Sequence, residues 1–471
     1  MNKLKYLLQN TAIFAISQFT SKVMVFLLLP LYTSYMTTTE YGSADLVFST
    51  ISLLLPVFTV QIASAVMRFA IEDKEKGNLY YIKGLKVTLI GFVILLCLLP
   101  VFIKINIFGE NLYLFYILYL ANAVYNLLSY YARAIDRLKL VGIVGVINTA
   151  VVVGANIVLL IFLKQGVFGY LISYIAGYVV GSLIFAIVMN RDICITFNKN
   201  SKTEMREMTK YSLPLVPNSI SWWGVSTANK YIINGYLSKS VLGLYSVALK
   251  IPTIINTIQN ILAEALVLSV LKEYDSEEKD EKYFSLLYKM YNFCITFFTA
   301  GIILSTKMLA KILFANDFYD GWIYVPLLCI PSVWGALAGY LGTFYSASKK
   351  NNGMFLSTVL GGVITIVFSF ATIKTMGIIG IIIGNVISYF VIFLYRYIDT
   401  KKFVNLKINM FKDVIGWLLL FAQSLAIMYL ENALLYYSIN VICVLLILLL
   451  NKDLLGMFIK VIKDKLFKRR A

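Results

Sequence analysis

Apolar stretches of about 20 residues follow one another along almost the whole chain, and they constrain the fold more than any other feature. A helix rises about 1.5 Å per residue, so each stretch is long enough to cross a hydrocarbon layer about 30 Å thick. Of the 471 residues, 60% are hydrophobic and 14% are charged, whereas soluble domains carry about 25% charged residues. The sequence therefore predicts an all-α polytopic membrane protein.

Hydropathy predicts about fourteen transmembrane helices, and the loops between them carry an uneven charge. The tails and every second loop hold 33 of the 42 Lys and Arg residues, while the other loops hold six. Because cytoplasmic loops are enriched in Lys and Arg, this alternation favours fourteen spans with both termini cytoplasmic. The predicted spans lie near residues 10–32, 44–67, 84–103, 112–132, 140–163, 167–189, 211–236, 244–271, 286–305, 323–345, 353–373, 377–396, 411–430 and 434–451.

The net charge of +18 follows from the same bias. It indicates contact with anionic membrane lipids, and it does not indicate nucleic acid, because no basic soluble domain is present to bind it. Residues 452–471 place apolar side chains on one helical face and lysines opposite, which predicts a basic amphipathic cytoplasmic tail on the inner leaflet.

An internal repeat divides the chain. YMTTTEYGSADLVF at 35–48 aligns with YLSKSVLGLYSVAL at 236–249, at an offset of 201, and two further pairs of segments follow in the same order. Six helices per copy give two copies that run in the same direction, as in transporters with parallel halves. The predicted domains are an N-terminal six-helix lobe at 1–201, a C-terminal six-helix lobe at 202–400, two additional helices at 401–451 and the tail.

The composition argues against several kinds of enzyme. The chain has no histidine, which removes Ser–His and Cys–His catalysis, His-ligated metals and His proton relays. Its five cysteines are scattered without metal-binding spacing, so no metal or cofactor is expected. The outer loops are short, which disfavours a membrane enzyme such as a polymerase or acyltransferase.

Ionisable residues inside predicted spans mark functional sites by default, because burying a charge in a bilayer is costly. Lys22 lies near the middle of the first span, one turn after Gln18. Lys230 follows Asn229 about two turns below the outer surface, where extension of its side chain to the interface is an alternative. Trp222 and Trp223 precede them on the same span and have the shape to stack on sugar rings.

The span at 244–271 carries a polar stripe. Lys250, Thr253, Thr257, Asn260 and Glu264 recur every three or four residues, which places them on one helical face that cannot face lipid. Lys250 and Glu264 are about 21 Å apart along a helix, so each needs another partner.

Asp45 and Arg68, at the two ends of the span at 44–67, are candidate partners for these two charges, although interfacial anchoring also explains both residues. Glu264 is the only carboxylate predicted deep in the membrane and is a candidate for proton or sodium coupling. Three lysines against one acid predict a cationic cavity that prefers an anion such as a diphosphate.

Four segments together resemble a known family. They are EYGSADLVFSTISLLLPVFTVQIASAVMRF (40–69), RAIDRLKLVGIVGVIN (133–148), YSLPLVPNSISWWGV with NKYIINGYLSKSVLGLYSVALK (211–250) and GIIGIIIGNVISYF (377–390). Over about residues 1–400 the chain resembles the prokaryotic polysaccharide (O-antigen type) flippases of the multidrug/oligosaccharidyl-lipid/polysaccharide (MATE-like) exporter superfamily.

The resemblance implies a bacterial cytoplasmic membrane protein with two six-helix lobes around a central cavity. It further implies that the protein flips an undecaprenyl-diphosphate-linked oligosaccharide outward by alternating access, for surface polysaccharide assembly. Relatives commonly carry an acid–arginine pair late in the seventh span, where this chain has Asn229 and Lys230. Glycosyltransferases and a polysaccharide polymerase are the implied partners, and proton, sodium or membrane potential is the implied driving force.

Two further alternatives stay open. A cation-coupled drug or metabolite antiporter of the same fold would need Glu264. A non-transporting member of a synthesis complex would have no use for a continuous polar stripe.

Overall fold

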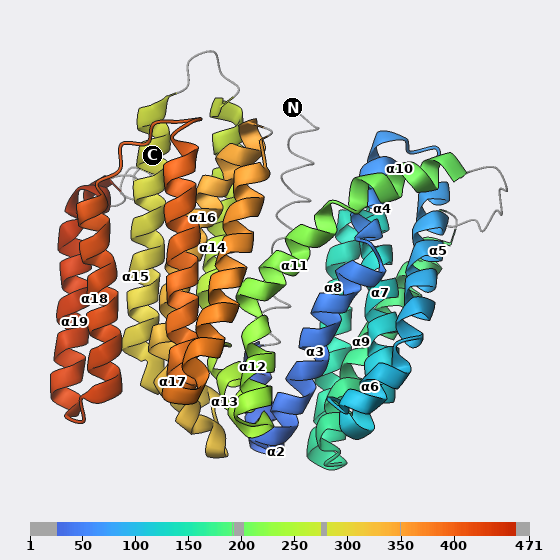
Figure 1. The fold of residues 1–471 in the computed structure, drawn as a ribbon, viewed down its shortest axis with the longest axis horizontal. Coiled ribbons are helices and arrows are strands. Elements are labelled where there is room, and N and C mark those ends of the chain that lie inside the picture. Colours follow the sequence, from blue (N-terminus) through green and yellow to red (C-terminus); the bar gives the residue numbers. More distant parts are fainter. Residues whose placement is uncertain (1–25, 191, 193–201, 275–279, 349, 458–471) are drawn as a thin grey trace, which may run out of the picture. The chain divides into compact units, whose positions relative to one another are not determined.

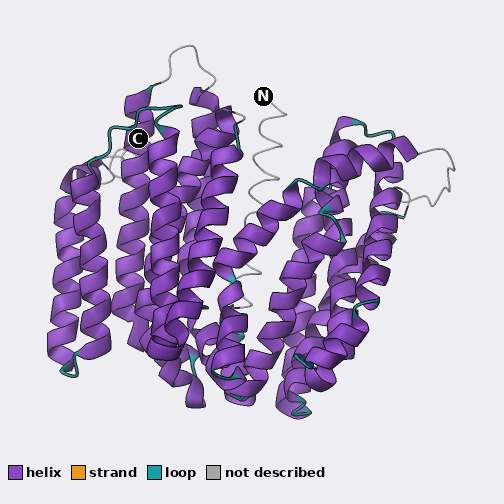
Figure 2. Ribbon diagram, in the orientation of Figure 1, coloured by secondary structure: helices purple, strands orange, loops and turns teal. Residues whose placement is uncertain are grey.

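The computed structural model describes residues 26–190, 192, 202–274, 280–348 and 350–457 (Figure 1). All regular secondary structure in these ranges is helical (Figure 2). Ten of the described helices are long and apolar enough to cross a membrane, or eleven if the bent pair α13 and α14 is counted as one span. The protein is therefore an all-helical, multi-pass membrane protein. The count of fourteen spans stays a prediction, because the first of them falls largely outside the described residues.

The chain forms two compact units. The first comprises Met1–Leu244 and Ala315–Asp317, and the second comprises Tyr245–Phe314 and Phe318–Ala471. The boundaries fall inside α13 (Lys239–Ala248) and the 3-10 helix η3 (Asn316–Tyr324). The other helices of the first unit are α2 (Leu29–Tyr35), α3 (Thr38–Phe58), α4 (Ile62–Glu72), α5 (Gly77–Leu96), α6 (Leu99–Ile105), η1 (Gly109–Asn111), α7 (Leu112–Ala134), α8 (Leu138–Asn156), η2 (Ile157–Phe162), α9 (Gly166–Val188), α10 (Lys202–Ser212), α11 (Leu215–Ser226) and α12 (Ala228–Tyr236).

The second unit holds the remaining helices. They are α14 (Thr253–Tyr274), α15 (Glu281–Leu313), α16 (Val325–Ser348), α17 (Asn352–Thr400), α18 (Met410–Tyr429) and α19 (Ala433–Leu450). The long helix α17 contains two of the predicted spans, joined at Gly377, whose φ of 57° and ψ of −137° are available only to glycine at low cost.

Helix α3 begins at a capping box and ends at a break. The Thr37 hydroxyl accepts a hydrogen bond from the Glu40 backbone N–H, and the Glu40 carboxylate accepts one from the Thr37 backbone. Such reciprocal pairs satisfy backbone donors that the first turn leaves open. The chain leaves the helix after Phe58 and turns through Val60 and Gln61, both with positive φ. The predicted span near residues 44–67 is therefore not one continuous helix, because this turn separates α3 from α4.

Helix α10 packs on the end of the first unit and is not itself a span. Its Met208 is fully buried in a core that includes Ala70 and Tyr80. Lys83 of α5 donates a hydrogen bond to the Glu204 carboxylate at 2.9 Å, with the Lys83 side chain only 8% exposed. This contact lowers the pKa of Glu204 below its ordinary value, because the lysine stabilises the charged carboxylate. The ion pair thereby holds α10 against α5.

Helices α3 and α13 cross at two glycines, and the contact is reciprocal. A Cβ on Gly42 would lie 2.1 Å from the Lys239 carbonyl oxygen, and one on Gly243 would lie 2.0 Å from the Thr38 carbonyl oxygen. The Thr38 and Ser240 hydroxyls are hydrogen-bonded at 2.7 Å beside the crossing. The backbones come this close only because neither glycine has a side chain. Gly42 and Gly243 are related by the same offset of 201 that the sequence repeat predicts.

The second unit also contains a break that the sequence analysis placed inside a helix. Between α13 and α14 the Lys250 N–H bonds to the Val247 carbonyl and the Thr253 N–H to the Lys250 carbonyl, both three residues back. Pro252 has no N–H to continue the α-helical pattern. The predicted span near residues 244–271 is therefore divided between two helices, α13 and α14. Lys250 lies in the break, and the regular stripe begins at Thr253.

Side-chain contacts of Arg396 and Lys307 connect helices of the second unit. Arg396 of α17 is 1% exposed and donates to the Ser357 and Thr358 hydroxyls and to the Ala338 carbonyl. The bond to Ala338 joins α17 to α16, and the bonds to Ser357 and Thr358 join the two halves of α17 on either side of Gly377. Helices α18 and α19 form an antiparallel pair beside α15 (Figure 1). The Lys307 ammonium of α15 lies 4.0 Å from the ring centre of Tyr436, which attaches α19 by a cation–π contact.

Candidate functional site

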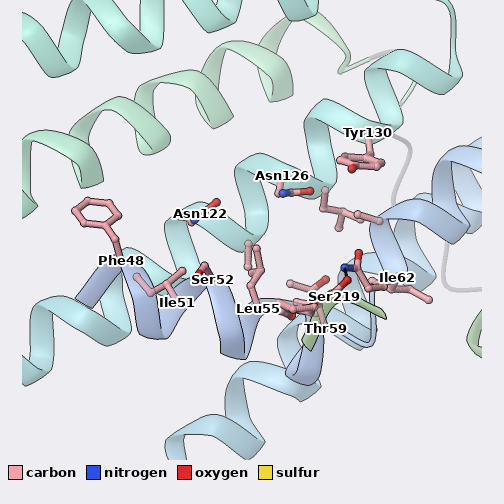
Figure 3. Close-up of a pocket in the computed structure, with 16 residues that line it drawn as sticks. Phe48, Ile51, Ser52, Leu55, Thr59, Ile62, Asn122, Asn126, Tyr130 and Ser219 are labelled. Carbon is pink, nitrogen blue, oxygen red and sulfur yellow. Dashed lines mark hydrogen bonds between the residues drawn. The ribbon is translucent and has the colours of Figure 1, made fainter. Parts of the chain in front are cut away.

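A polar cavity of about 460 Å³ lies within the first unit (Figure 3). Its walls come mainly from α3 and α7, with contributions from α4, α5 and α11. Both α3 and α7 are candidate membrane spans. The cavity therefore puts polar groups on two helices whose other faces are apolar.

Helical spacing explains how the two main walls form. One face of α7 carries Asn122, Asn126 and Tyr130, which are four residues apart. The opposite wall carries Ser52 of α3 and Thr59, which directly follows α3. Figure 3 shows the two groups of side chains coming from two different helices. Pro56 of α3 also lines the cavity, and its missing N–H leaves the Ser52 carbonyl without its usual helical donor.

The cavity wall carries no charged side chain, and only some of its polar side chains form hydrogen bonds within the described part of the chain. None of the described lining residues is Lys, Arg, Asp or Glu. The hydroxyls of Ser52, Thr59 and Thr88 each donate to a carbonyl of their own helix, so toward the cavity they act as acceptors. The amides of Asn122 and Asn126 make no hydrogen bond to another residue of the described part of the chain. They remain available as donors and acceptors.

The break between α3 and α4 forms one end of the cavity. Val60 and Gln61 have φ of 53° and 54°, a left-handed conformation that a β-branched residue such as Val60 rarely adopts. Gln61 donates from Nε2 to the Ser219 hydroxyl of α11 at 2.7 Å. Backbone strain of this kind persists where surrounding contacts determine it, and it clusters at functional sites.

A largely buried ion pair joins the same helix α3 to α12. The Lys230 ammonium of α12 is 2.7 Å from the Asp45 carboxylate, and the two side chains are only 16% and 11% exposed. Asp45 therefore supplies an acid for Lys230 that position 229 lacks. The sequence analysis named Asp45 as a partner for Lys250 or Glu264, whereas the structure pairs it with Lys230.

Further contacts tie α11 and α12 to α3. The Trp223 indole N–H donates to the Ser49 carbonyl at 3.0 Å, and the Tyr231 and Thr50 hydroxyls are hydrogen-bonded to each other. The helices that open the second sequence copy thus pack within the first compact unit, which ends at Leu244.

The structure separates the other predicted site residues. Asn229 is 1% exposed and Trp222 is half-buried, both on the helices that pack against α3. Arg68 lies at the exposed end of α4, 3.0 Å from Glu72, with its guanidinium 4.6 Å from the ring centre of Tyr211. The contact with Tyr211 joins the end of α4 to α10.

The second unit contains the rest of the stripe. Thr253 and Asn260 are exposed on α14 and Thr257 is half-buried between them. Lys250, in the break, forms no ion pair with any described residue. Gln18 and Lys22 lie outside the described residues, as do the Glu264 side chain and the predicted tail beyond Met457.

The cavity itself was not predicted from the sequence. Two signals were available: Asn122 and Asn126 are polar residues four apart inside a predicted span, and the repeat offset of 201 relates the α3 wall to the stripe of α14. By that offset Ser52, Pro56 and Thr59 correspond to Thr253, Thr257 and Asn260.

Comparison with known proteins gives a family and a fold. The profile described as polysaccharide biosynthesis protein matches residues 7–270, more than half of the chain. No curated protein sequence matches at a significant level. Among solved structures, the lipid II flippase MurJ in an inward closed conformation is similar with a TM-score of 0.70 at 13% identity, over 94% of this chain and 100% of that chain.

Two multidrug-type structures are also similar. An inward-facing multidrug resistance transporter of the MATE family and MOP superfamily has a TM-score of 0.66 at 16% identity, over 83% of this chain and 98% of that one. A MOP superfamily transporter from Pyrococcus furiosus, described as having a binding pocket of reverse polarity, has a TM-score of 0.59 at 16% identity, over 84% and 94%. At these identities the likeness shows the fold. The chain therefore belongs to the polysaccharide biosynthesis protein family and has the membrane fold of the MOP superfamily.

Proposed function

We propose that the protein flips an undecaprenyl-diphosphate-linked oligosaccharide from the inner to the outer leaflet of the bacterial cytoplasmic membrane, for surface polysaccharide assembly. The family match over residues 7–270 carries the proposal. The transporter fold and the polar helix faces of α3 and α14 support it, because a protein that moves a glycan through a bilayer needs polar surface at membrane depth. Glycosyltransferases supply such a substrate and a polymerase consumes it.

Three lysines in or beside predicted spans bind the diphosphate in this proposal. Lys250 lies in a helix break without an ion-pair partner among the described residues, which leaves its charge available to an anion. Lys22 adds a second cation in the first span. Lys230 is already neutralised by Asp45, so a diphosphate must compete with that carboxylate for it. These three lysines would line a cationic cavity, which is not the uncharged cavity of Figure 3. Alternating access then exposes the cationic cavity to each side of the membrane in turn.

In this proposal, two acidic residues of the predicted spans, Asp45 and Glu264, couple transport to an ion gradient. Protonation of Asp45 would free Lys230 for the substrate, and Glu264 is the second candidate for proton or sodium coupling. The membrane potential is the third source, worth about 2.3 kcal/mol per elementary charge per 100 mV.

The test replaces Lys22 and Lys250 by Ala, singly and together, in a strain that depends on this gene for surface polysaccharide. We expect about a tenfold or larger loss of polymer for the double variant, since each charge-assisted contact is worth about 1.5–3 kcal/mol. Lys104→Ala, an exposed lysine at the end of α6, is the matched control. Normal polymer from correctly inserted double variant would contradict the binding role.

A cation-coupled drug or metabolite antiporter is the alternative, favoured by the similarity to a multidrug resistance transporter. It predicts efflux of cationic dyes that Glu264→Gln abolishes. The flippase proposal predicts no dye efflux and translocation of a fluorescent diphosphate-linked oligosaccharide in proteoliposomes.

A further inference from the structure

We propose that the cavity of the first unit binds an uncharged sugar ring. The inference rests on the proposed function in one respect, namely that the cargo contains a glycan. The site is distinct from the lysines assigned to the diphosphate.

The first property is that polar groups in the cavity wall need hydrogen-bond partners inside the cavity. Asn122 and Asn126 lie within a candidate span and make no hydrogen bond to another described residue. A polar group that is removed from water without a hydrogen bond costs several kcal/mol, most of all at membrane depth. These amides must therefore bond either to water or to a ligand that replaces it.

The second property is electrical neutrality. Anionic ligands are typically held by Lys or Arg, and divalent metal ions or organic cations by Asp or Glu, whereas the described lining residues include none of these. Charged groups in low-dielectric surroundings are costly unless paired. The walls therefore favour an uncharged ligand over either kind of ion.

The third property is the mixture of hydrogen-bonding groups. Sugar hydroxyls donate and accept at once. The two asparagine amides offer both functions, and the hydroxyls of Ser52, Thr59 and Thr88 offer acceptors because their protons already bond to the helix. A ligand with donors alone would leave the two amide NH2 groups unpaired, and a ligand with acceptors alone would leave the amide and hydroxyl oxygens unpaired.

The fourth property is shape. Phe48 and Tyr130 lie among the lining residues and present apolar ring faces. A sugar ring has C–H faces that pack on aromatic rings and a rim of hydroxyls that reaches polar side chains. The volume of about 460 Å³ falls within the range of about 300–1,000 Å³ that is usual for small-molecule sites. A single ring with its linkage fits these dimensions.

The experiment measures binding of lipid-free sugars to the full-length protein in nanodiscs by calorimetric titration. The probes are methyl glycosides of glucose, galactose, N-acetylglucosamine, N-acetylgalactosamine and rhamnose. Methyl glucuronide, which differs from methyl glucoside by one carboxylate, is the charged comparison. We expect at least one uncharged glycoside to bind, and the glucuronide to bind about tenfold or more weakly than the glucoside.

The variant Asn122→Leu/Asn126→Leu removes both amides while keeping side-chain size. We expect it to weaken binding of the uncharged glycoside about tenfold or more, since two hydrogen bonds are lost. Tyr113→Leu, an exposed residue of the same helix α7, is the matched control and should bind normally. If the double variant does not insert, the single variant Asn126→Ser takes its place with a smaller expected loss.

Two results would overturn the inference: no uncharged glycoside binds the wild-type protein, or the double variant binds as the wild type does. Either would leave the cavity as a water-filled space. Because this assay contains neither lipid-linked substrate nor transport, it is independent of the flippase test. A protein that binds glycosides but moves no lipid-linked oligosaccharide would contradict the proposed function alone.

Discussion

At the scale of single residues, the Asp45–Lys230 pair shows that a lysine in a predicted span has a structural contact in addition to its charge. A lysine with its acid partner on a neighbouring helix is a contact between helices as well as a cation. Replacing such a pair by apolar groups can be nearly neutral, but removing one member leaves a buried charge and is strongly destabilising. The pair therefore stabilises the packing of α12 against α3, independently of any role in transport.

The first prediction concerns that pair. Asp45→Asn should lower the stability of the purified protein by about 3 kcal/mol, because it leaves Lys230 buried without its acid. The measurement is the thermal unfolding midpoint in detergent. Glu72→Gln, which breaks the exposed pair with Arg68, should change the midpoint little.

The charge-exchanged variant Asp45→Lys/Lys230→Asp separates pairing from a specific role of either residue. It should recover most of the lost stability. If Asp45→Asn unfolds at the wild-type temperature, the ion pair does not hold the two helices.

The sequence could predict that Lys230 lies in an apolar stretch and needs a partner, but it could not predict which residue that partner is. An ionisable residue in an apolar stretch is conspicuous on its own. Its partner depends on which helix packs beside it, and Asp45 lies in a span 185 residues away by number. The same holds for Asn122 and Asn126, which look like ordinary polar residues until α3 is placed opposite them.

At the scale of helices, the breaks and crossings position the site. Hydropathy identifies helices because the transfer of each side chain into lipid is a local property. It does not identify where a helix bends. Pro252 gives a local signal for the break before α14, whereas the turn at Val60–Gln61 has neither glycine nor proline. Packing against α11 through the Gln61–Ser219 bond accounts for that turn, and packing cannot be read from one segment.

The next prediction concerns the crossing of α3 and α13. Gly42→Val and Gly243→Val should each destabilise the protein by about 1–3 kcal/mol, because the new side chain would overlap a backbone carbonyl that cannot move independently. The readout is the unfolding midpoint together with the amount of protein inserted in membranes.

Gly154→Val is the matched control, since no atom lies within 4 Å of the position a Cβ would take there. Equal behaviour of all three variants would mean that the two helices are not in close contact.

At the scale of the whole molecule, the sequence predicted the class of protein and its family. The all-helical membrane fold and the membership of the polysaccharide biosynthesis family are confirmed. The number of spans and the cytoplasmic position of both termini remain predictions, because they rest on the distribution of Lys and Arg over loops.

A topology experiment decides these points. Reporter fusions should place residue 237, between α12 and α13, and residue 314, after α15, outside the cytoplasm, and both tails inside. The physical reason is that loops rich in Lys and Arg stay cytoplasmic, and the two named loops are poor in them. A C-terminal fusion that reports an outside location would contradict the even number of spans.

The reciprocal glycine contact also has a consequence for the ancestry of the chain. In a two-fold homodimer, residue i of one subunit meets residue j of the other, and j meets i. Gly42 against Lys239 and Gly243 against Thr38 have this form, since 239 and 243 follow 38 and 42 by the repeat offset. Consider a gene that encoded only one of the two sequence repeats. In a homodimer of its product, one glycine codon would supply the glycine on both sides of the contact. In the present chain the two codons mutate separately, and each glycine faces a backbone carbonyl of the other helix, so a change in either one spoils a contact that α3 and α13 share.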